Sequence, residues 1–141
     1  MEEHEIPPNS NVYAELGSTW RYARRDPNTA AHIIGKLVKH IGEKKVLYGS
    51  DCIWYGSPQD QVQAFRTFQI SDELQEKHGY PKMTPELRAR IFGLNATRPY
   101  GINVDEVLKR ARHDVIEHRL TAYREKPDPH FLKFVPNFRL F

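Results

Sequence analysis

Two short apolar segments, separated by an amphipathic helical pattern, constrain most strongly what this chain can fold into. In residues 11–17, apolar side chains alternate with others, which predicts a strand with two different faces. The run KKVLYGSD predicts a second strand at about 45–50, apolar on both faces and ended by Gly-Ser-Asp. Between the two segments, apolar residues recur at helical spacing over about 28–41. A strand, a helix and a strand in this order predict a right-handed βαβ unit with two parallel strands.

The predicted helix at 28–41 has clear start and stop signals. Asp26 can cap its first turn, Pro27 fits a position where no backbone N–H is needed, and Gly42 ends it. Similar openings at Ser57-Pro and Thr84-Pro predict two further helices. Two parallel strands with several helices are too few to close a sheet on their own.

One long final helix is predicted over about 104–125. It begins after Asn103 with acidic residues in its first turn, where carboxylates favour the positive end of the helix dipole. Its apolar positions recur at helical spacing: Val104, Val107, Leu108, Ala111 and Val115. Beyond Lys126, the tail contains three prolines and four phenylalanines, which predicts an extended segment that packs on the chain or on a partner. We therefore expect a first region at 1–102 and a second at 103–141.

Composition excludes several classes of protein. The chain has 141 residues, the usual size of one domain, and its single cysteine cannot form an internal disulfide bond. We expect Cys52 to be buried and inert. The net charge of +3 is too small to indicate nucleic-acid binding, and basic residues in the last predicted helix are balanced by acidic ones. No apolar run is long enough to span a membrane, and no secretory signal is evident, so we expect a soluble, cytoplasmic protein.

Asp51 is the first candidate for chemistry because it follows the second predicted strand. Ligands bind at the carboxyl ends of parallel strands, where side chains and loops converge. Asp51 shares a face with Gly49, which leaves room beside it, and its carboxylate could ligate a metal or take a proton from a metal-bound water. The alternative is a turn aspartate that caps backbone N–H groups. Glu15 could line the same crevice, but we expect it to face solvent at an edge.

Other candidate residues are less specific. Trp54 and Tyr55 follow Asp51 and could form the apolar wall of a substrate pocket, or could be surface aromatic residues folded over a helix end. None of the seven histidines occurs in an H-x-H or H-E-x-x-H motif, so no complete metal site can be written from the sequence.

Three pieces of the chain together resemble the carboxy-terminal part of the amidohydrolase-related metal-dependent hydrolases, a group that includes aminocarboxymuconate-semialdehyde-type decarboxylases. They are N-V-Y in the first predicted strand, the strand-ending G-S-D, and N-A-x-x followed by an aromatic residue and Gly near residue 101, and they cover about residues 11–102. The resemblance implies the last part of a (β/α)8 TIM barrel. It also implies that Asp51 contacts a divalent metal, usually zinc, that the loop with Trp54 borders the substrate, and that Asn95 is structural.

The chain departs from this family because it lacks the H-x-H of the first barrel strand and the histidines of the middle strands. A whole barrel needs about 250 residues, and a catalytic zinc site needs roughly three protein ligands. We therefore expect a carboxy-terminal fragment of a hydrolase or decarboxylase that acts on a small carboxylate or carbonyl compound and is inactive alone. The missing strands could also come from a partner chain. The alternative is a non-catalytic module that assembles with a partner or a second copy.

Overall fold

A computed structural model describes residues 6–127 of the chain. These residues divide into two compact units, one that ends at Gly101 and one that begins at Ile102. Within this described range, none of the helices combines the length and the apolar character needed to cross a membrane.

The first unit contains the predicted pair of parallel strands. Strand β1 (Ala14–Glu15) pairs with β2 (Val46–Leu47), with Ala14 opposite Val46 and Glu15 opposite Leu47. Both residues of β2 are buried, as its apolar run predicts. Both strands are shorter than predicted, and β1 ends early because the chain turns into helix α1 at Gly17, two residues after Glu15.

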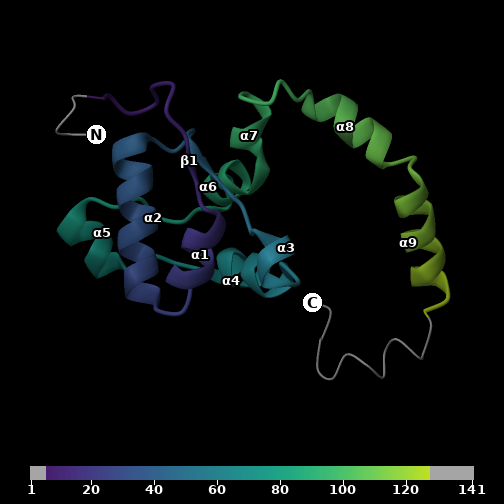
Figure 1. The fold of residues 1–141 in the computed structure, drawn as a ribbon, viewed down its shortest axis with the longest axis horizontal. Helices are drawn as coiled ribbons and strands as arrows, with labels where there is room; N and C mark the ends of the chain where they lie inside the picture. Colours follow the sequence, from purple (N-terminus) through teal and green to yellow (C-terminus); the bar gives the residue numbers. More distant parts are fainter. Residues whose placement is uncertain (1–5, 128–141) are drawn as a thin grey trace. The chain divides into compact units, whose positions relative to one another are not determined.

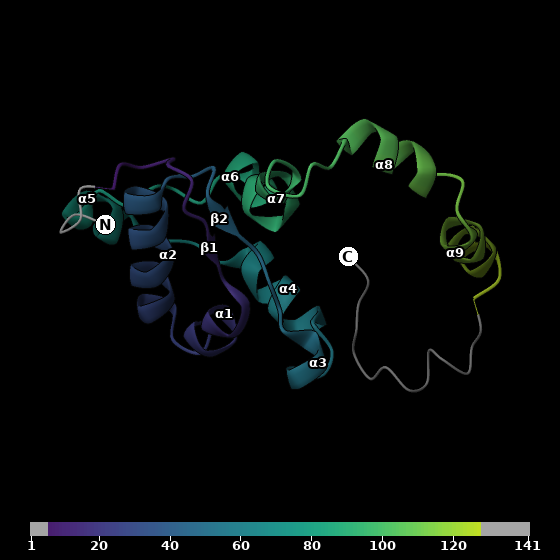
Figure 2. The same cartoon turned by 45° about the horizontal axis from the view of Figure 1, so that its top comes forward.

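The connection between the strands contains two helices, α1 (Gly17–Ala23) and α2 (Pro27–Ile41), which lie side by side (Figure 1 and Figure 2). The predicted helix is α2, and its start signal is confirmed: the Asp26 side chain accepts hydrogen bonds from the backbone N–H groups of Asn28 and Thr29. Helix α1 was not predicted, and no side-chain cap marks its beginning.

Several short helices follow β2. Helix α4 (Gln59–Thr67) matches the opening predicted at Ser57. Helix α6 (Pro85–Ala89) matches the opening predicted at Thr84, whose hydroxyl oxygen accepts a hydrogen bond from the Leu87 N–H group. The helical segments are α3 (Cys52–Tyr55), α4 (Gln59–Thr67), α5 (Asp72–His78), α6 (Pro85–Ala89), the π-helical turn η1 (Arg90–Leu94) and α7 (Asn95–Thr97).

The core of this unit lies between the strands and the helices and is rich in aromatic residues. The Trp20 ring makes edge-to-face contacts with Phe65 and Phe68, at centroid distances of 4.9 and 5.4 Å. The buried apolar residues of this core are Leu16, Trp20, Ala23, Ala30, Ala31, Ile34, Val38, Val46, Phe65, Phe68, Ile70, Tyr80, Met83, Leu87 and Ile91. Helix α1, which the sequence did not predict, thus contributes the largest fully buried side chain of this core, Trp20.

Asn95 connects the last helical turns of this unit to the sheet. Its buried side-chain amide donates hydrogen bonds to the carbonyl oxygens of Glu43 and Val46, both at 2.8 Å. The backbone N–H group of Tyr48 donates to the Ile91 carbonyl at 2.9 Å. These bonds satisfy carbonyl and amide groups beside β2, and they give Asn95 the structural role expected for it.

The second unit corrects the prediction of a single long helix. It contains α8 (Val104–Ala111) and α9 (Val115–Glu125), which Figure 1 shows as separate segments. The break lies before Asp114, whose side chain accepts a hydrogen bond from the Glu117 N–H group and so caps a new helix. The Phe- and Pro-rich tail predicted beyond Lys126 falls almost wholly outside the described residues.

Candidate functional site

Asp51 lies between β2 and α3 and has a left-handed backbone conformation, with φ 47° and ψ 41°. Asp and Asn adopt this conformation more readily than other residues that carry a side chain. The side chain makes no capping bond to α3, so the capping alternative considered from the sequence is not what the structure has. Instead, Asp51 Oδ2 accepts a hydrogen bond of 2.6 Å from the Ser18 hydroxyl group.

Ser18 links Asp51 to two tyrosines. Its oxygen lies 2.9 Å from the Tyr55 hydroxyl oxygen, which lies 3.5 Å from that of Tyr22. A serine hydroxyl has one proton, and here that proton is donated to Asp51, so Ser18 accepts from Tyr55. The hydrogen bond with Tyr55 raises the pKa of Tyr22 above its ordinary value. Tyr55, a predicted pocket residue, is thus joined to Asp51 through one hydroxyl group.

Glu15 lies closer to Asp51 than the sequence indicated. The residue is exposed, as expected for an edge, but its Oε1 accepts a 2.9 Å hydrogen bond from the Gly17 N–H group. A Cβ atom built on Gly17 would lie 2.7 Å from Glu15 Oε2 and 3.0 Å from Asp51 Oδ2. The two carboxylates therefore lie within about 6 Å of each other, a range over which like charges interact.

Two glycines make room for this arrangement. A Cβ atom on Gly49 would lie only 1.5 Å from Glu15 Oε1, so the Glu15 carboxylate fills the space that Gly49 leaves. The sequence suggested that this space lies beside Asp51, but did not indicate that Glu15 fills it. Gly17 has a φ of +25° and is approached by both carboxylates. Larger side chains at these two positions would separate Glu15 from Asp51.

The predicted pocket residues differ in their surroundings. Trp54 is 80% exposed. Tyr55 is partly buried, and the guanidinium carbon of Arg21 lies 5.4 Å from its ring centroid. The expectation that Cys52 is buried is wrong. The residue is exposed because it begins the short helix α3 at the surface.

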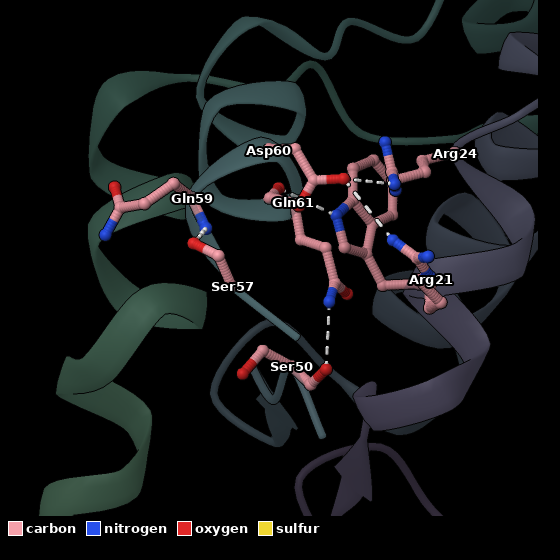
Figure 3. Close-up of polar contacts among 8 residues, drawn as sticks. Arg21, Arg24, Ser50, Ser57, Gln59, Asp60 and Gln61 are labelled. Carbon is pink, nitrogen blue, oxygen red and sulfur yellow. Dashed lines mark hydrogen bonds and ion pairs between the residues drawn. The ribbon is translucent and has the colours of Figure 1, made fainter. Parts of the chain in front are cut away.

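Polar side chains join α1 to α4, and the α4 residue Gln61 also contacts the segment before Asp51 (Figure 3). Asp60 accepts from Arg21 at 3.3 Å and from Arg24 at 2.5 Å, so one carboxylate is shared by two cations. Gln61 points toward Ser50 and donates to its carbonyl oxygen at 3.0 Å. Because Gln61 is completely buried, this bond fixes the backbone one residue before Asp51.

The described residues do not form a metal centre by themselves. Among residues 6–127, no group of three or more His, Cys, Asp and Glu side chains is placed to hold an ion. Histidines take other roles: His32 Nδ1 lies 3.0 Å from the Tyr80 hydroxyl oxygen, and the rings of His32 and His78 are in edge contact. Glu15 and Asp51 supply two carboxylates, fewer than the roughly three protein ligands of a catalytic zinc site.

Comparison with known proteins gives one family. No curated protein and no solved structure matches the chain significantly. Residues 8–102 match the family described as amidohydrolase, and this range includes both strands, Asp51 and Asn95. A mostly helical unit with one pair of parallel strands is consistent with part of the α/β fold of that family. Residues 8–102 make up more than half of the chain, and the chain therefore belongs to the amidohydrolase family.

Proposed function

We propose that this chain supplies the carboxy-terminal part of the active site of a metal-dependent enzyme. The enzyme hydrolyses or decarboxylates a small carboxylate or carbonyl compound. In this proposal Asp51 is the catalytic and metal-contacting carboxylate, and Trp54 and Tyr55 border the substrate. The observation that supports it most is the position of Asp51, at the carboxyl end of a parallel strand in a chain of the amidohydrolase family.

The hydrogen bonds around Asp51 suit a carboxylate that takes part in chemistry. Ser18 donates a hydrogen bond to one oxygen, which restrains the plane of the group. Gln61 holds the carbonyl of the preceding residue, so both backbone and side chain are restrained. A carboxylate held in this way can accept a proton from water or contact a cation without first reorganising.

In this proposal, the other ligands come from outside the described residues. Since residues 6–127 provide no group of three ligands, the chain needs histidines from an upstream segment of the same enzyme or from a partner chain. The family resemblance implies a divalent metal, usually zinc. The chain alone is then an inactive carboxy-terminal fragment.

The test compares the chain expressed alone with the product of the upstream coding region joined to it. Metal content is measured by mass spectrometry, and turnover is measured on a panel of small carboxylates and carbonyl compounds. We expect metal and activity only in the longer product, and Asp51→Asn should lower turnover by at least about a hundredfold. Asp72→Asn, at an exposed position on α5, is the matched control and should have little effect. A longer product that binds no metal and keeps its activity after Asp51→Asn would refute the proposal.

A second candidate function is a non-catalytic assembly module. It is favoured by the apolar side chains that α8 and α9 expose, among them Leu108 at 51% and Ile116 at 65%. Light scattering after size-exclusion chromatography separates the two candidates. A chain that remains a folded, metal-free monomer and gains activity only with the upstream segment would exclude the assembly module.

A further inference from the structure

A cavity of about 350 Å³ lies between helix α1, the first turn of α2 and the end of α4. Sites for small molecules have volumes of about 300–1,000 Å³ and mostly apolar walls with a few polar groups. The apolar residues that line this cavity are Trp20, Pro27, Ala30, Ala64 and Phe68. Both its size and its walls therefore suit the apolar body of a small molecule.

The two aromatic residues of the wall are held in place by the surrounding fold. The indole N–H group of Trp20 donates a hydrogen bond of 3.0 Å to the carbonyl oxygen of Gln61. The rings of Trp20 and Phe68 are in edge contact at a centroid distance of 5.4 Å, and both side chains are buried. A wall that is already ordered loses little conformational entropy when a ligand packs on it.

Arg24 provides the polar group of the cavity. It is the one charged residue among the described residues that line it, and its side chain is 22% exposed. Its Nη2 atom donates a hydrogen bond to Asp60, while its Nε atom is buried and has no hydrogen-bond partner. A guanidinium group has five N–H donors, so the bond to Asp60 leaves donors for a ligand.

The charges around Arg24 favour an anion. Arg21 and Arg24 both point toward Asp60, at 3.3 and 2.5 Å, so the three side chains together carry one net positive charge (Figure 3). None of the described Asp and Glu residues lines the cavity. A carboxylate pairs with a guanidinium group through charge-assisted hydrogen bonds, which are stronger than those between neutral groups.

We propose that this cavity binds a small carboxylate with an apolar body. The carboxylate lies at the guanidinium group of Arg24, and the apolar part packs on Trp20 and Phe68. A ring with a short acidic side chain, as in 3-phenylpropanoate, has this chemistry. Asp51 does not line the cavity, so this binding is independent of the function proposed for that residue.

Nuclear magnetic resonance of the chain, titrated with 3-phenylpropanoate, tests the proposal. The chain has two tryptophans: Trp20 lines the cavity, and Trp54 on α3 is 80% exposed and does not. The indole N–H signal of Trp20 should shift and saturate, and that of Trp54 should stay in place, with Trp54→Phe to assign the two signals. The uncharged 3-phenylpropanamide has the same body and should bind at least about tenfold more weakly, because it lacks the charge that Arg24 recognises.

Two variants separate the charge of the cavity from its shape. Arg24→Gln should lower the affinity for the acid to that for the amide and leave the affinity for the amide unchanged. The matched control, Arg25→Gln, removes an exposed charge that does not line the cavity and should bind the acid as before. Ala64→Leu fills the cavity and should abolish the binding of both compounds, with circular dichroism to verify that each variant is folded.

Three results would overturn the proposal. The first is a Trp20 signal that shows no saturable shift with the acid. The second is equal affinity of the unchanged chain for the acid and the amide, a comparison that needs no variant to fold. The third is a folded Ala64→Leu variant that binds the acid as tightly as the unchanged chain.

Discussion

Replacing Gly35 with alanine should destabilise the fold, although the same change inside a helix usually stabilises it. Gly35 is buried in α2, and a Cβ atom there would lie 2.4, 2.5 and 2.8 Å from three atoms of the Tyr80 ring. The ring cannot move away easily. It is 6% exposed, its hydroxyl oxygen lies 3.0 Å from His32 Nδ1, and it stacks on the His78 ring at a centroid distance of 5.1 Å.

The expected size follows from two opposing effects. Inserting a methyl group into a well-packed core costs about 1–3 kcal/mol. Alanine in place of glycine in a helix interior increases the free energy of unfolding by about 1 kcal/mol. Because three rigid ring atoms lie within 3 Å of the new carbon, the cost should be near its upper end, and we expect a net loss of about 1–2 kcal/mol in the free energy of unfolding.

Urea unfolding followed by circular dichroism measures this difference. Gly93→Ala is the matched control: nothing lies within 4 Å of a Cβ atom at Gly93, so this variant should be unchanged or slightly more stable. In a Tyr80→Ala background the ring is absent, and Gly35→Ala should no longer destabilise. A Gly35→Ala variant as stable as the original chain would refute the close packing of Tyr80 on α2.

Three further predictions each concern one residue. Asn95→Ala removes the hydrogen bonds to the Glu43 and Val46 carbonyls and should lower the free energy of unfolding by about 2 kcal/mol, measured in urea. The pKa of His78 is lowered by partial burial, a neighbouring histidine and three lysines, so the unfolded chain binds the proton more tightly. The free energy of unfolding should decrease as the pH falls through the ordinary pKa range of histidine. His78→Gln should weaken this pH dependence, as measured by thermal unfolding at several pH values. Cys52 is exposed, so one equivalent of a thiol reagent should react with the folded chain at the rate seen in denaturant; a reaction that required unfolding would contradict this.

The parts of the fold that could be predicted are those with local chemical signals. Helix α2 is bounded by a capping Asp26, a proline in its first turn and Gly42 at its end, and the prediction differs from the structure by one residue. The parallel pairing of β1 and β2 followed from the order of strand, helix and strand. Hydrophobic spacing and caps act over a few residues, so a sequence shows them directly.

Helix α1 could not be predicted in the same way, and this affected the site. It has seven residues, and its N-cap position, Leu16, makes no side-chain capping bond. The prediction therefore extended β1 through Gly17. Ser18 and Tyr22, the α1 residues of the hydrogen-bonded chain at Asp51, were assigned no role, because the helix that carries them was missing from the prediction.

The sequence contains a capping residue at the break between α8 and α9, but its regular apolar spacing favours one continuous helix. The apolar spacing continues from Ala111 to Val115, which favours one helix, but Asp114 can also cap a helix that begins at Val115. In the structure the capping bond to Glu117 is formed, and the helix restarts. The capping bond of Asp114 therefore determines where the helix restarts. The apolar residues on either side are largely exposed, so little packing favours one continuous helix.

The left-handed backbone of Asp51 limits which mutations are informative at this position. Alanine, glutamate and β-branched residues fit that conformation poorly, so a loss of activity after such changes would mix local refolding with lost chemistry. Asparagine keeps the shape and tolerates the backbone, and glycine relieves its strain. Both Asp51→Asn and Asp51→Gly keep the turn, so a loss of activity in these variants reports the lost carboxylate, whereas an alanine variant would combine that loss with a disturbed backbone.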